Sequence, residues 1–213
     1  MPATHQKKAQ GEASRRRLLD AAAQLLGTGG YSSSSVDAIA KKAGVVKSAL
    51  YWHFGNKKGL LMAALIQFTE GWVQEVQDAV DGASSPIDRL NRLLEHVQEL
   101  ILHGPLRRRM VFSMLVERGS HDEEVRSTIK GFYETMRQSL AEGFSESVQV
   151  PADRLYVISD ALMSLCDGMF LQFMADQDAE RLDRSVQEIR RIIVFRLAQE
   201  VQWAATQARN PSE

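Results

Sequence analysis

The chain of 213 residues contains a single cysteine, Cys166. One thiol excludes an intramolecular disulfide and a cluster of thiolate ligands around a metal, which is typical of proteins from a reducing compartment. Cys166 lies in an apolar run, where we expect it to be a small buried residue; a reactive sensor thiol is the alternative.

Long apolar runs are also missing. A membrane-spanning helix needs about 18 or more consecutive apolar residues, and no uninterrupted stretch here approaches that length. The first eight residues, Met-Pro-Ala-Thr-His-Gln-Lys-Lys, are polar and lack the apolar region of a signal peptide. With 44% hydrophobic and 25% charged residues, the composition is that of an ordinary globular protein of one or two domains. We therefore expect a cytoplasmic protein with no membrane partner.

The patterns of catalytic sites are absent as well. His96 and His103 are seven residues apart, and neither belongs to a His-x-x-x-His or Glu-x-x-His metal motif. No nucleophile elbow is present, and the glycine cluster at residues 27–30 lacks the Gly-Lys-Ser/Thr ending of a phosphate-binding loop. We expect no enzyme activity, no metal and no cofactor.

Net charge is nearly zero over the whole chain, at −1, but it is unevenly distributed. Residues 1–60 contain ten Lys and Arg against three Asp and Glu, a net charge of +7, whereas residues 61–213 contain 16 against 24, a net charge of −8. A basic segment attracts nucleic-acid phosphates. The start of this basic segment indicates either a solubilising tail or a flexible arm that contacts phosphates or a minor groove. The residues concerned are Lys7, Lys8, Arg15, Arg16 and Arg17.

The basic segment has the pattern of a helix-turn-helix. Apolar residues recur at helical spacing from residue 15 to 26, and the glycines that follow predict an end near residue 28. Ser35 is a candidate N-cap for a short helix over about 36–43, and Gly44 follows where a tight turn between helices often requires positive φ.

A third helix is expected over about residues 47–54. Its inward positions are Leu50 and Phe54, and its other faces carry polar and aromatic side chains. Exposed aromatic residues beside cations indicate a surface that binds a partner. The alternative is that Tyr51 and Trp52 belong to the core of a small helical unit.

The stretch from about residue 15 to 65 resembles the DNA-binding domain of the tetracycline-repressor (TetR) family of bacterial transcription regulators. Four short runs carry the resemblance: Ser35-Val36-Asp37-Ala38-Ile39-Ala40, Ala43-Gly44-Val45, Leu50-Tyr51-Trp52-His53-Phe54 and Asn56-Lys57-Lys58-Gly59-Leu60-Leu61. Two positions depart from the family pattern: Val46 replaces a common capping Ser, and Ala49 replaces a common Thr. Loss of a capping hydroxyl costs about 0.5–2 kcal/mol of helix stability.

The resemblance implies that the third helix lies in the major groove of double-stranded DNA. Lys47 and Ser48 would approach base edges, and Lys57 would meet a phosphate. The physical chemistry agrees, because a Lys can donate to guanine O6 or N7 and a helix N-terminus attracts anions. Tyr51, Trp52 and His53 would lie against sugar and phosphate. The expected DNA-binding residues are therefore Ser35, Val36, Lys47, Ser48, Tyr51, Trp52, His53 and Lys57.

The remaining sequence predicts helices and no strand, so the expected fold is all-α with about nine helices. Pro, Gly and Asp residues separate helices over about 57–80, 87–103, 106–118, 122–146, 152–175 and 179–207. The expected domains are a flexible basic arm (1–14), a helix-turn-helix domain (15–56), a connecting helix (57–80) and a ligand-binding and dimerisation domain (81–213).

Inward positions of the last domain are rich in Met and Phe. Thioether side chains adapt to irregular shapes, which suits an apolar cavity, although ordinary core packing has the same composition. The resemblance implies an effector pocket in this domain. The expected ligand-binding residues are Met110, Met114, Phe132, Met136, Met163, Met169, Phe170 and Phe173.

The last two helices have the composition of an association surface. Residues 192–195 are apolar around almost the full helix circumference, more than one domain core would bury. The resemblance implies a four-helix interface between two subunits. The expected interface residues are Leu155, Ser159, Leu162, Ile189, Ile193, Leu197 and Val201.

These expectations combine into a ligand-responsive regulator. A homodimer would bind a palindromic operator, repress transcription and be released by a small apolar or amphipathic effector. The alternatives are a DNA-binding regulator without an effector, or an activator with the same fold.

Overall fold

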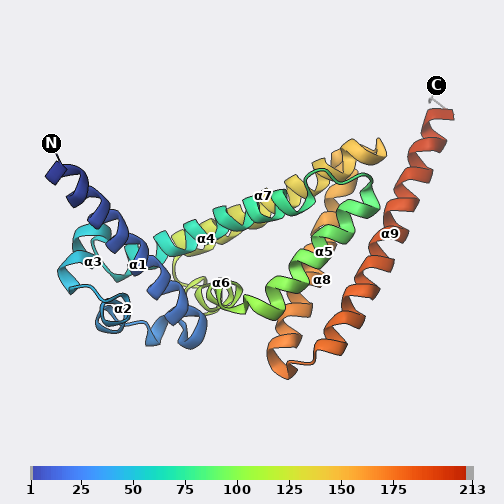
Figure 1. Ribbon diagram of the computed structural model, residues 1–213. Helices are drawn as coiled ribbons and strands as arrows, with labels where there is room; N and C mark the ends of the chain where they lie inside the picture. The colour runs from blue at the N-terminus through green and yellow to red at the C-terminus, as the bar shows by residue number, and fades with distance from the viewer. Residues whose placement is uncertain (1, 210–213) are drawn as a thin grey trace. The chain divides into compact units, whose positions relative to one another are not determined.

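The computed structural model describes residues 2–209, and all regular secondary structure within them is helical (Figure 1). The all-α prediction is therefore confirmed for the described residues. The helices are α1 (Pro2–Ser33), α2 (Val36–Ala43), α3 (Lys47–Phe54), α4 (Lys57–Val80), α5 (Pro86–His103), α6 (Pro105–Arg118), α7 (Glu123–Val148), α8 (Ala152–Asp176) and α9 (Ala179–Arg209).

Helices α2, α3 and α4 have the bounds that the sequence predicts, and the later helices differ from the prediction by at most two residues at each end. Local capping explains this agreement. Asn56 Oδ1 accepts from the backbone N–H of Gly59 at 2.8 Å and caps α4. Pro86 and Pro105 begin α5 and α6, where a missing N–H costs least.

Helix α1 differs from the prediction at both ends. The sequence indicated a flexible arm over 1–14, but the helix extends back to Pro2; Met1 and the side chains of residues 2–7 lie outside the described part. Ala, Gln and Lys dominate this segment, and these are good helix formers. Of the three glycines expected to end the helix, only Gly30 interrupts it, with φ 75°.

Gly27 has a different role from the one predicted. It lies inside α1, where a Cβ atom would be only 2.3 Å from the carbonyl oxygen of Leu106. The backbone at the start of α6 therefore packs directly against α1, which only glycine at this position allows.

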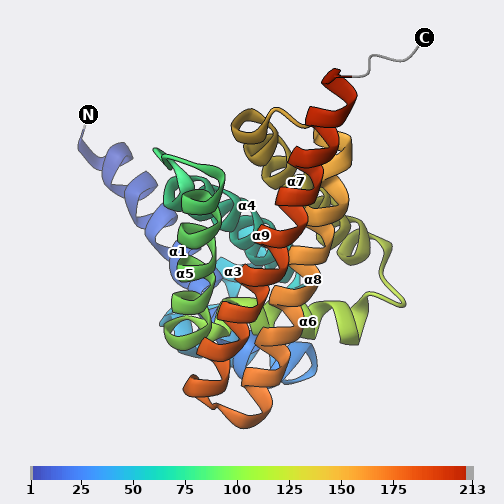
Figure 2. The same cartoon turned by 90° about the vertical axis from the view of Figure 1, so that its right-hand side faces the viewer.

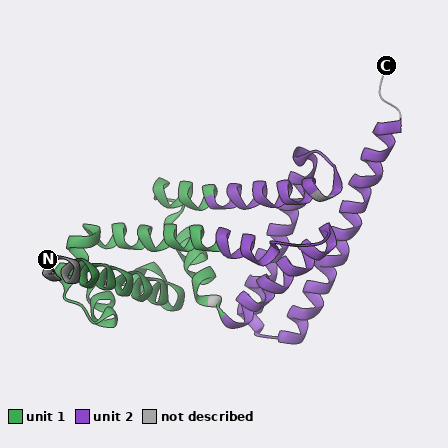
Figure 3. Ribbon diagram, turned by 45° about the horizontal axis from the view of Figure 1, so that its top comes forward, with its two compact units in different colours: residues 1–72, 104–131 green, residues 73–103, 132–213 purple. Residues whose placement is uncertain are grey.

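The chain divides into two compact units (Figure 3). Unit 1 comprises residues 1–72 and 104–131, and unit 2 comprises residues 73–103 and 132–213. The sequence predicted a connecting helix over 57–80 and a single domain over 81–213. In the structure, α6 and the first turns of α7 group with the N-terminal helices, because α6 packs on α1.

In unit 1, α1 packs against α2, α3 and α6, and α2 packs against α3. The core consists of apolar side chains from each helix and from the start of α4. The largest fully buried ones include Leu18, Leu26, Ile39, Leu50 and Leu60. Each contributes about 1.5–3 kcal/mol through removal from water, so α3 is anchored by Leu50.

In unit 2, α8 and α9 lie side by side, and α5 packs against both (Figures 1 and 2). Polar side chains also connect α7 to α8. Tyr133 Oη donates to Asp167 at 2.6 Å, and Tyr156 Oη donates to Glu134 at 2.7 Å.

One helix in the described part of the chain, α8, has the length and composition of a membrane span. Its 18-residue window has a mean hydropathy of 1.3, and 39% of that window is buried within the protein. Core helices of globular proteins pass the same test, so the result is weak evidence for a span.

Candidate nucleic-acid interface

Helix α2 is capped at both ends, and its C-terminal cap forms the turn into α3. Ser35 Oγ accepts from the backbone N–H of Ala38 at 3.1 Å and caps the first turn. Gly44 adopts the left-handed conformation, with φ 63°, that the sequence predicted. The backbone N–H of Val45 donates to the Ala40 carbonyl at 3.1 Å and closes the helix end.

Helix α3 buries one side and exposes the other. Leu50 is completely buried, whereas Tyr51 is 51% exposed and Trp52 is 77% exposed. The alternative that both aromatic rings belong to the core is therefore wrong. Large exposed aromatic side chains of this kind are typical of a surface that binds a partner.

The front of α3 carries the features that the sequence indicated. Val46 is the N-cap residue, makes no side-chain cap and is largely exposed. Lys47 and Ser48 are both exposed. Lys47 forms an ion pair with Asp37 on α2, and both side chains are open to solvent, so the pair is screened and easily exchanged for another partner.

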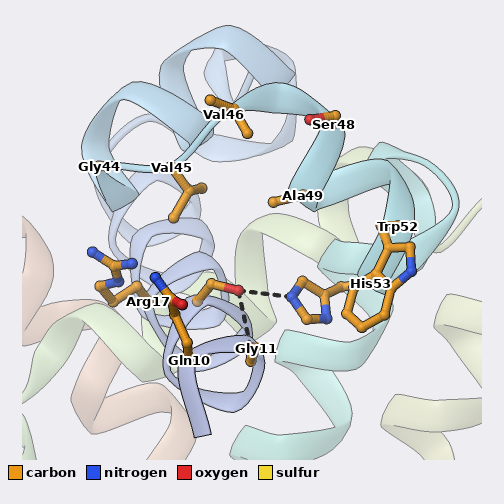
Figure 4. Close-up of a pocket in the computed structure, with 11 residues that line it drawn as sticks. Gln10, Gly11, Arg17, Gly44, Val45, Val46, Ser48, Ala49, Trp52 and His53 are labelled. Carbon is orange, nitrogen blue, oxygen red and sulfur yellow. Dashed lines mark hydrogen bonds between the residues drawn. The ribbon is translucent and has the colours of Figure 1, made fainter. Parts of the chain in front are cut away.

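A groove runs between α3 and the N-terminal half of α1 (Figure 4). Its volume is about 640 Å³, and α1 contributes Gln10, Gly11, Ser14 and Arg17 to its lining. Gln10 and Ser14 were not among the DNA-binding residues expected from the sequence. Their only signal was helical spacing in a segment expected to be an arm.

His53 links the two walls of this groove. Its Nε2 lies 2.8 Å from Ser14 Oγ, and that hydroxyl donates to the carbonyl of Gly11 at 2.9 Å (Figure 4). The Ser14 oxygen therefore accepts from the imidazole N–H. Burial and, to a smaller extent, the positive charge of Arg15 lower the pKa of His53.

Lys57 has another environment than the one expected. Its Nζ donates to the carbonyl of Tyr31 at 2.7 Å and lies 4.1 Å from the centroid of the Tyr31 ring. Burial lowers the pKa of this ammonium. The resemblance implied a phosphate contact for Lys57, whereas in the structure its ammonium group donates to a backbone carbonyl of the protein.

Ser35 and Val36, the two DNA-binding residues expected at the start of α2, are less available for DNA than the residues of α3. Ser35 is exposed, but its hydroxyl is occupied as the cap; Val36 is partly buried. Within the described residues, no group of three or more His, Cys, Asp or Glu could hold a metal.

The eight expected ligand-binding residues are divided between the units. Met110 and Met114 are buried in unit 1, and the other six belong to unit 2. Four of those six are buried, namely Phe132, Met136, Met169 and Phe170, whereas Met163 and Phe173 are partly exposed. That they line a cavity stays a prediction.

The structure places the expected dimer residues differently from the sequence analysis. Leu155, Ser159, Leu162, Ile189, Ile193 and Leu197 are each at most 5% exposed and are covered by their own chain, and only Val201 is open, at 41%. The exposed apolar residues of α8 and α9 lie on other faces: Val157, Leu171, Ile192 and Phe195. Apolar periodicity identifies a buried face but not what buries it.

The fold and this surface define a class of DNA-binding transcription regulators, and comparisons with known proteins agree. The model of the bacterial regulatory proteins, tetR family, matches residues 18–64. The uncharacterized HTH-type transcriptional regulator TtgW of Pseudomonas putida is 31% identical over 117 residues, which cover 48% of this chain and 87% of TtgW. The HTH-type transcriptional regulator SrpR of Pseudomonas putida is 32% identical over 117 residues, but the match spans only 55% of its length and 48% of this chain.

A solved structure extends the similarity over most of the chain. NalD of Pseudomonas aeruginosa, the secondary repressor of the MexAB-OprM multidrug efflux pump, is 26% identical with a TM-score of 0.60, over 84% of this chain and 96% of NalD. The chain belongs to the TetR family and is a DNA-binding transcriptional regulator. Its relatives are regulators rather than enzymes.

Proposed function

We propose that the protein is a ligand-responsive repressor of the cytoplasm that binds a palindromic operator as a homodimer and is released by a small, largely apolar effector. The observation that carries the proposal is the exposed face of α3, on the segment of the chain with a net charge of +7. A basic surface with exposed aromatic and hydroxyl side chains is suited to the DNA backbone and base edges.

On DNA, Lys47 and Ser48 would contact base edges, since they open α3 and are exposed. Lys47 would exchange Asp37 for a guanine acceptor. Tyr51 and Trp52 would donate hydrogen bonds to phosphates from Oη and Nε1, and their rings would pack on sugars. These contacts use side chains that are already on the surface.

Dimerisation would use the outward stripe of α8. Val157, Ala161, Ser164, Gly168 and Leu171 recur at helical spacing, and all except the partly buried Gly168 are exposed. A Cβ atom at Gly168 would meet nothing within 4 Å, so the surface is open there. Small residues between two apolar ones allow close approach of a second helix.

Helix α9, which packs against α8, also carries an exposed apolar pair. Ile192 is 46% exposed and Phe195 is 63% exposed. Burial of these side chains together with the α8 stripe against a second copy would contribute to the more than about 1,200 Å² that a stable interface buries.

The effector proposal is supported by the apolar side chains of unit 2. Met136 on α7 and Met163 on α8 are long, adaptable side chains, and Phe132 on α7 adds apolar surface. The Tyr133–Asp167 and Tyr156–Glu134 hydrogen bonds connect these two helices. A ligand that binds best to a conformation with wrongly spaced α3 helices would release the operator. A shift from 99:1 to 1:99 needs about 5.5 kcal/mol of differential binding.

Three measurements test the function. Gel shift on a duplex that the protein selects from random DNA should give a saturable dimer complex, and no preference for any duplex would contradict the proposal. Thermal unfolding with a panel of apolar compounds should identify one that raises the melting temperature and releases the duplex. A compound that stabilises without release, or none that stabilises, would favour the regulator without an effector. Reporter transcription that rises with the protein would indicate an activator.

A further inference from the structure

The last turn of α6 meets the break in α1 inside unit 1. Glu117 Oε1 accepts from the backbone N–H of Tyr31 at 2.8 Å. Its Oε2 accepts from the backbone N–H of Ser32 at 3.1 Å and from Ser32 Oγ at 3.0 Å. One carboxylate thus holds three donors from residues that are 85 or 86 positions away in the sequence.

The break in α1 requires such a partner. Gly30 has φ 75° and ψ −177°, so the helix stops and one further turn begins after it. The first N–H groups of a helical turn have no acceptor within the helix, and a carboxylate is well suited to them. A Cβ atom at Gly30 would lie 2.2 Å from Glu117 Oε1, so the contact also requires glycine.

Two cations complete the arrangement around the Tyr31 ring. Lys57 Nζ lies 4.1 Å from the ring centroid and Arg118 Cζ lies 4.8 Å from it. Burial would raise the pKa of Glu117, but the hydrogen bonds from Tyr31 and Ser32 outweigh it, so the pKa lies below its ordinary value. Glu117 is therefore an anion at neutral pH, and its hydrogen bonds are charge-assisted.

The segment that Glu117 holds leads directly into α2. Ser34 is completely buried, and its Oγ donates to the Gly30 carbonyl at 2.8 Å. The next residue, Ser35, is the N-cap of α2, and α2 packs against α3. The conformation of this segment therefore sets where α2 begins and how α3 is presented.

We propose that Glu117 is a positioning residue for operator binding, which fixes the turn before α2 through Tyr31 and Ser32, and that Lys57 completes this clamp instead of contacting a phosphate. The proposal goes beyond the proposed function, because it requires neither an effector nor repression. It assigns a role in DNA binding to a side chain on α6, outside the helix-turn-helix.

The charge of Glu117 makes the direction of the expected change in DNA affinity informative, because a purely electrostatic effect and loss of the clamp change that affinity in opposite directions. Glu117→Gln removes one negative charge, and electrostatics alone would then tighten DNA binding slightly. Loss of the clamp should weaken it. Glu123→Gln is the matched control, since Glu123 is exposed, belongs to unit 1 and pairs with Arg126 on its own helix.

The test uses the full chain, a duplex selected from random DNA by the wild-type protein, and a random duplex. Glu117→Gln should bind the selected duplex about tenfold more weakly and the random duplex within about twofold of the wild type. Its salt dependence should be unchanged, because no phosphate contact is lost. Glu123→Gln should bind as the wild type or slightly tighter. Wild-type-like binding of Glu117→Gln, or equal loss on both duplexes, would overturn the proposal.

A spectroscopic readout separates positioning from general destabilisation. In the wild type, the amide resonances of Tyr31 and Ser32 should titrate at acidic pH as Glu117 takes up a proton, and in Glu117→Gln they should not. Should Glu117→Gln fail to fold, Ser32→Ala provides the test. It removes only the Oγ bond, and about threefold weaker binding of the selected duplex is expected. No change with Ser32→Ala, or amides that titrate equally in both proteins, would contradict the clamp.

Lys57 is tested by its own variant. Lys57→Met should weaken binding of the selected duplex without changing the salt slope. If Lys57 contacts a phosphate instead, Lys57→Met should reduce that slope by about 0.9 and weaken binding to all duplexes alike. This result would contradict the role of Lys57 in the clamp.

Discussion

Helices α3 and α9 both expose large aromatic side chains, and the surroundings of these side chains differ. Trp52 on α3 is 77% exposed and lies on the segment with a net charge of +7. Phe195 on α9 is 63% exposed, has Ile192 as an exposed neighbour one turn away, and lies on the segment with a net charge of −8. Exposure alone indicates a partner; the surrounding charge indicates whether that partner is a polyanion or an apolar protein surface.

The largest effect should come from charges placed in the α9 surface. Ile192→Glu with Phe195→Glu should convert the protein to a monomer and weaken operator binding at least about 100-fold, because each buried apolar anchor contributes about 2 kcal/mol or more. Sedimentation and gel shift measure the two results. Val116→Glu is the control, since Val116 is 77% exposed on α6, outside the proposed interface. A double variant that remains dimeric would contradict the assignment of this surface.

Substitution of Trp52 should have the next largest effect, and it should affect DNA binding without affecting dimerisation, unlike substitution of Phe195. Trp52→Ala should weaken binding to every duplex about 30-fold, through loss of a charge-assisted hydrogen bond and of packing on sugar. The dimer and the melting temperature should be unchanged. Trp52→Phe should recover the packing but not the hydrogen bond. Loss of dimerisation in Trp52→Ala would show that the contrast between the two helices is false.

Lys47→Ala should produce a smaller change and only in sequence preference. The ratio of selected to random DNA affinity should fall about tenfold, as expected for one contact to a base edge. Asp37→Asn, which removes the ion-pair partner, should preserve that ratio. Competition binding with single-base variants of the duplex would identify the position concerned; a uniform loss over all sequences would assign Lys47 to the backbone.

The smallest effect concerns pH. The pKa of His53 lies below its ordinary value of 6.5, because burial and then Arg15 disfavour the charged form. The unfolded chain therefore binds a proton first, so this contribution to stability is present above pH 6.5 and is lost as pH falls toward the folded pKa. His53→Gln should show a shallower decrease of the free energy of unfolding below pH 6.5. An identical pH profile for both proteins would show that His53 does not contribute to the pH dependence of stability.

The helix bounds could be predicted because local signals determine them. Ser35, Gly44 and Asn56 occupy caps and turns that can be recognised from the sequence of a few neighbouring residues. The helical start of α1 was missed because its basic composition indicated an arm. The division into units was missed because it depends on the packing of α6 against α1, made possible by Gly27.

The candidate sites were predictable only in part. Exposure of α3 followed from its unusual outward residues, but contacts between distant segments leave no periodic signal. The Glu117 clamp and the Lys57–Tyr31 bond belong to this group. On α9, Ile192 and Ile193 are equally apolar, yet Ile193 is covered by its own chain and Ile192 is open. Only the packed structure separates them.

Hydroxyl-radical footprinting of the wild-type protein on its selected duplex tests the central claim most directly. Two copies of α3 related by a two-fold axis should protect two symmetric half-sites, with centres about 34–36 Å apart or separated by a further whole helical turn. A single protected patch, or protection without two-fold symmetry, would contradict the account.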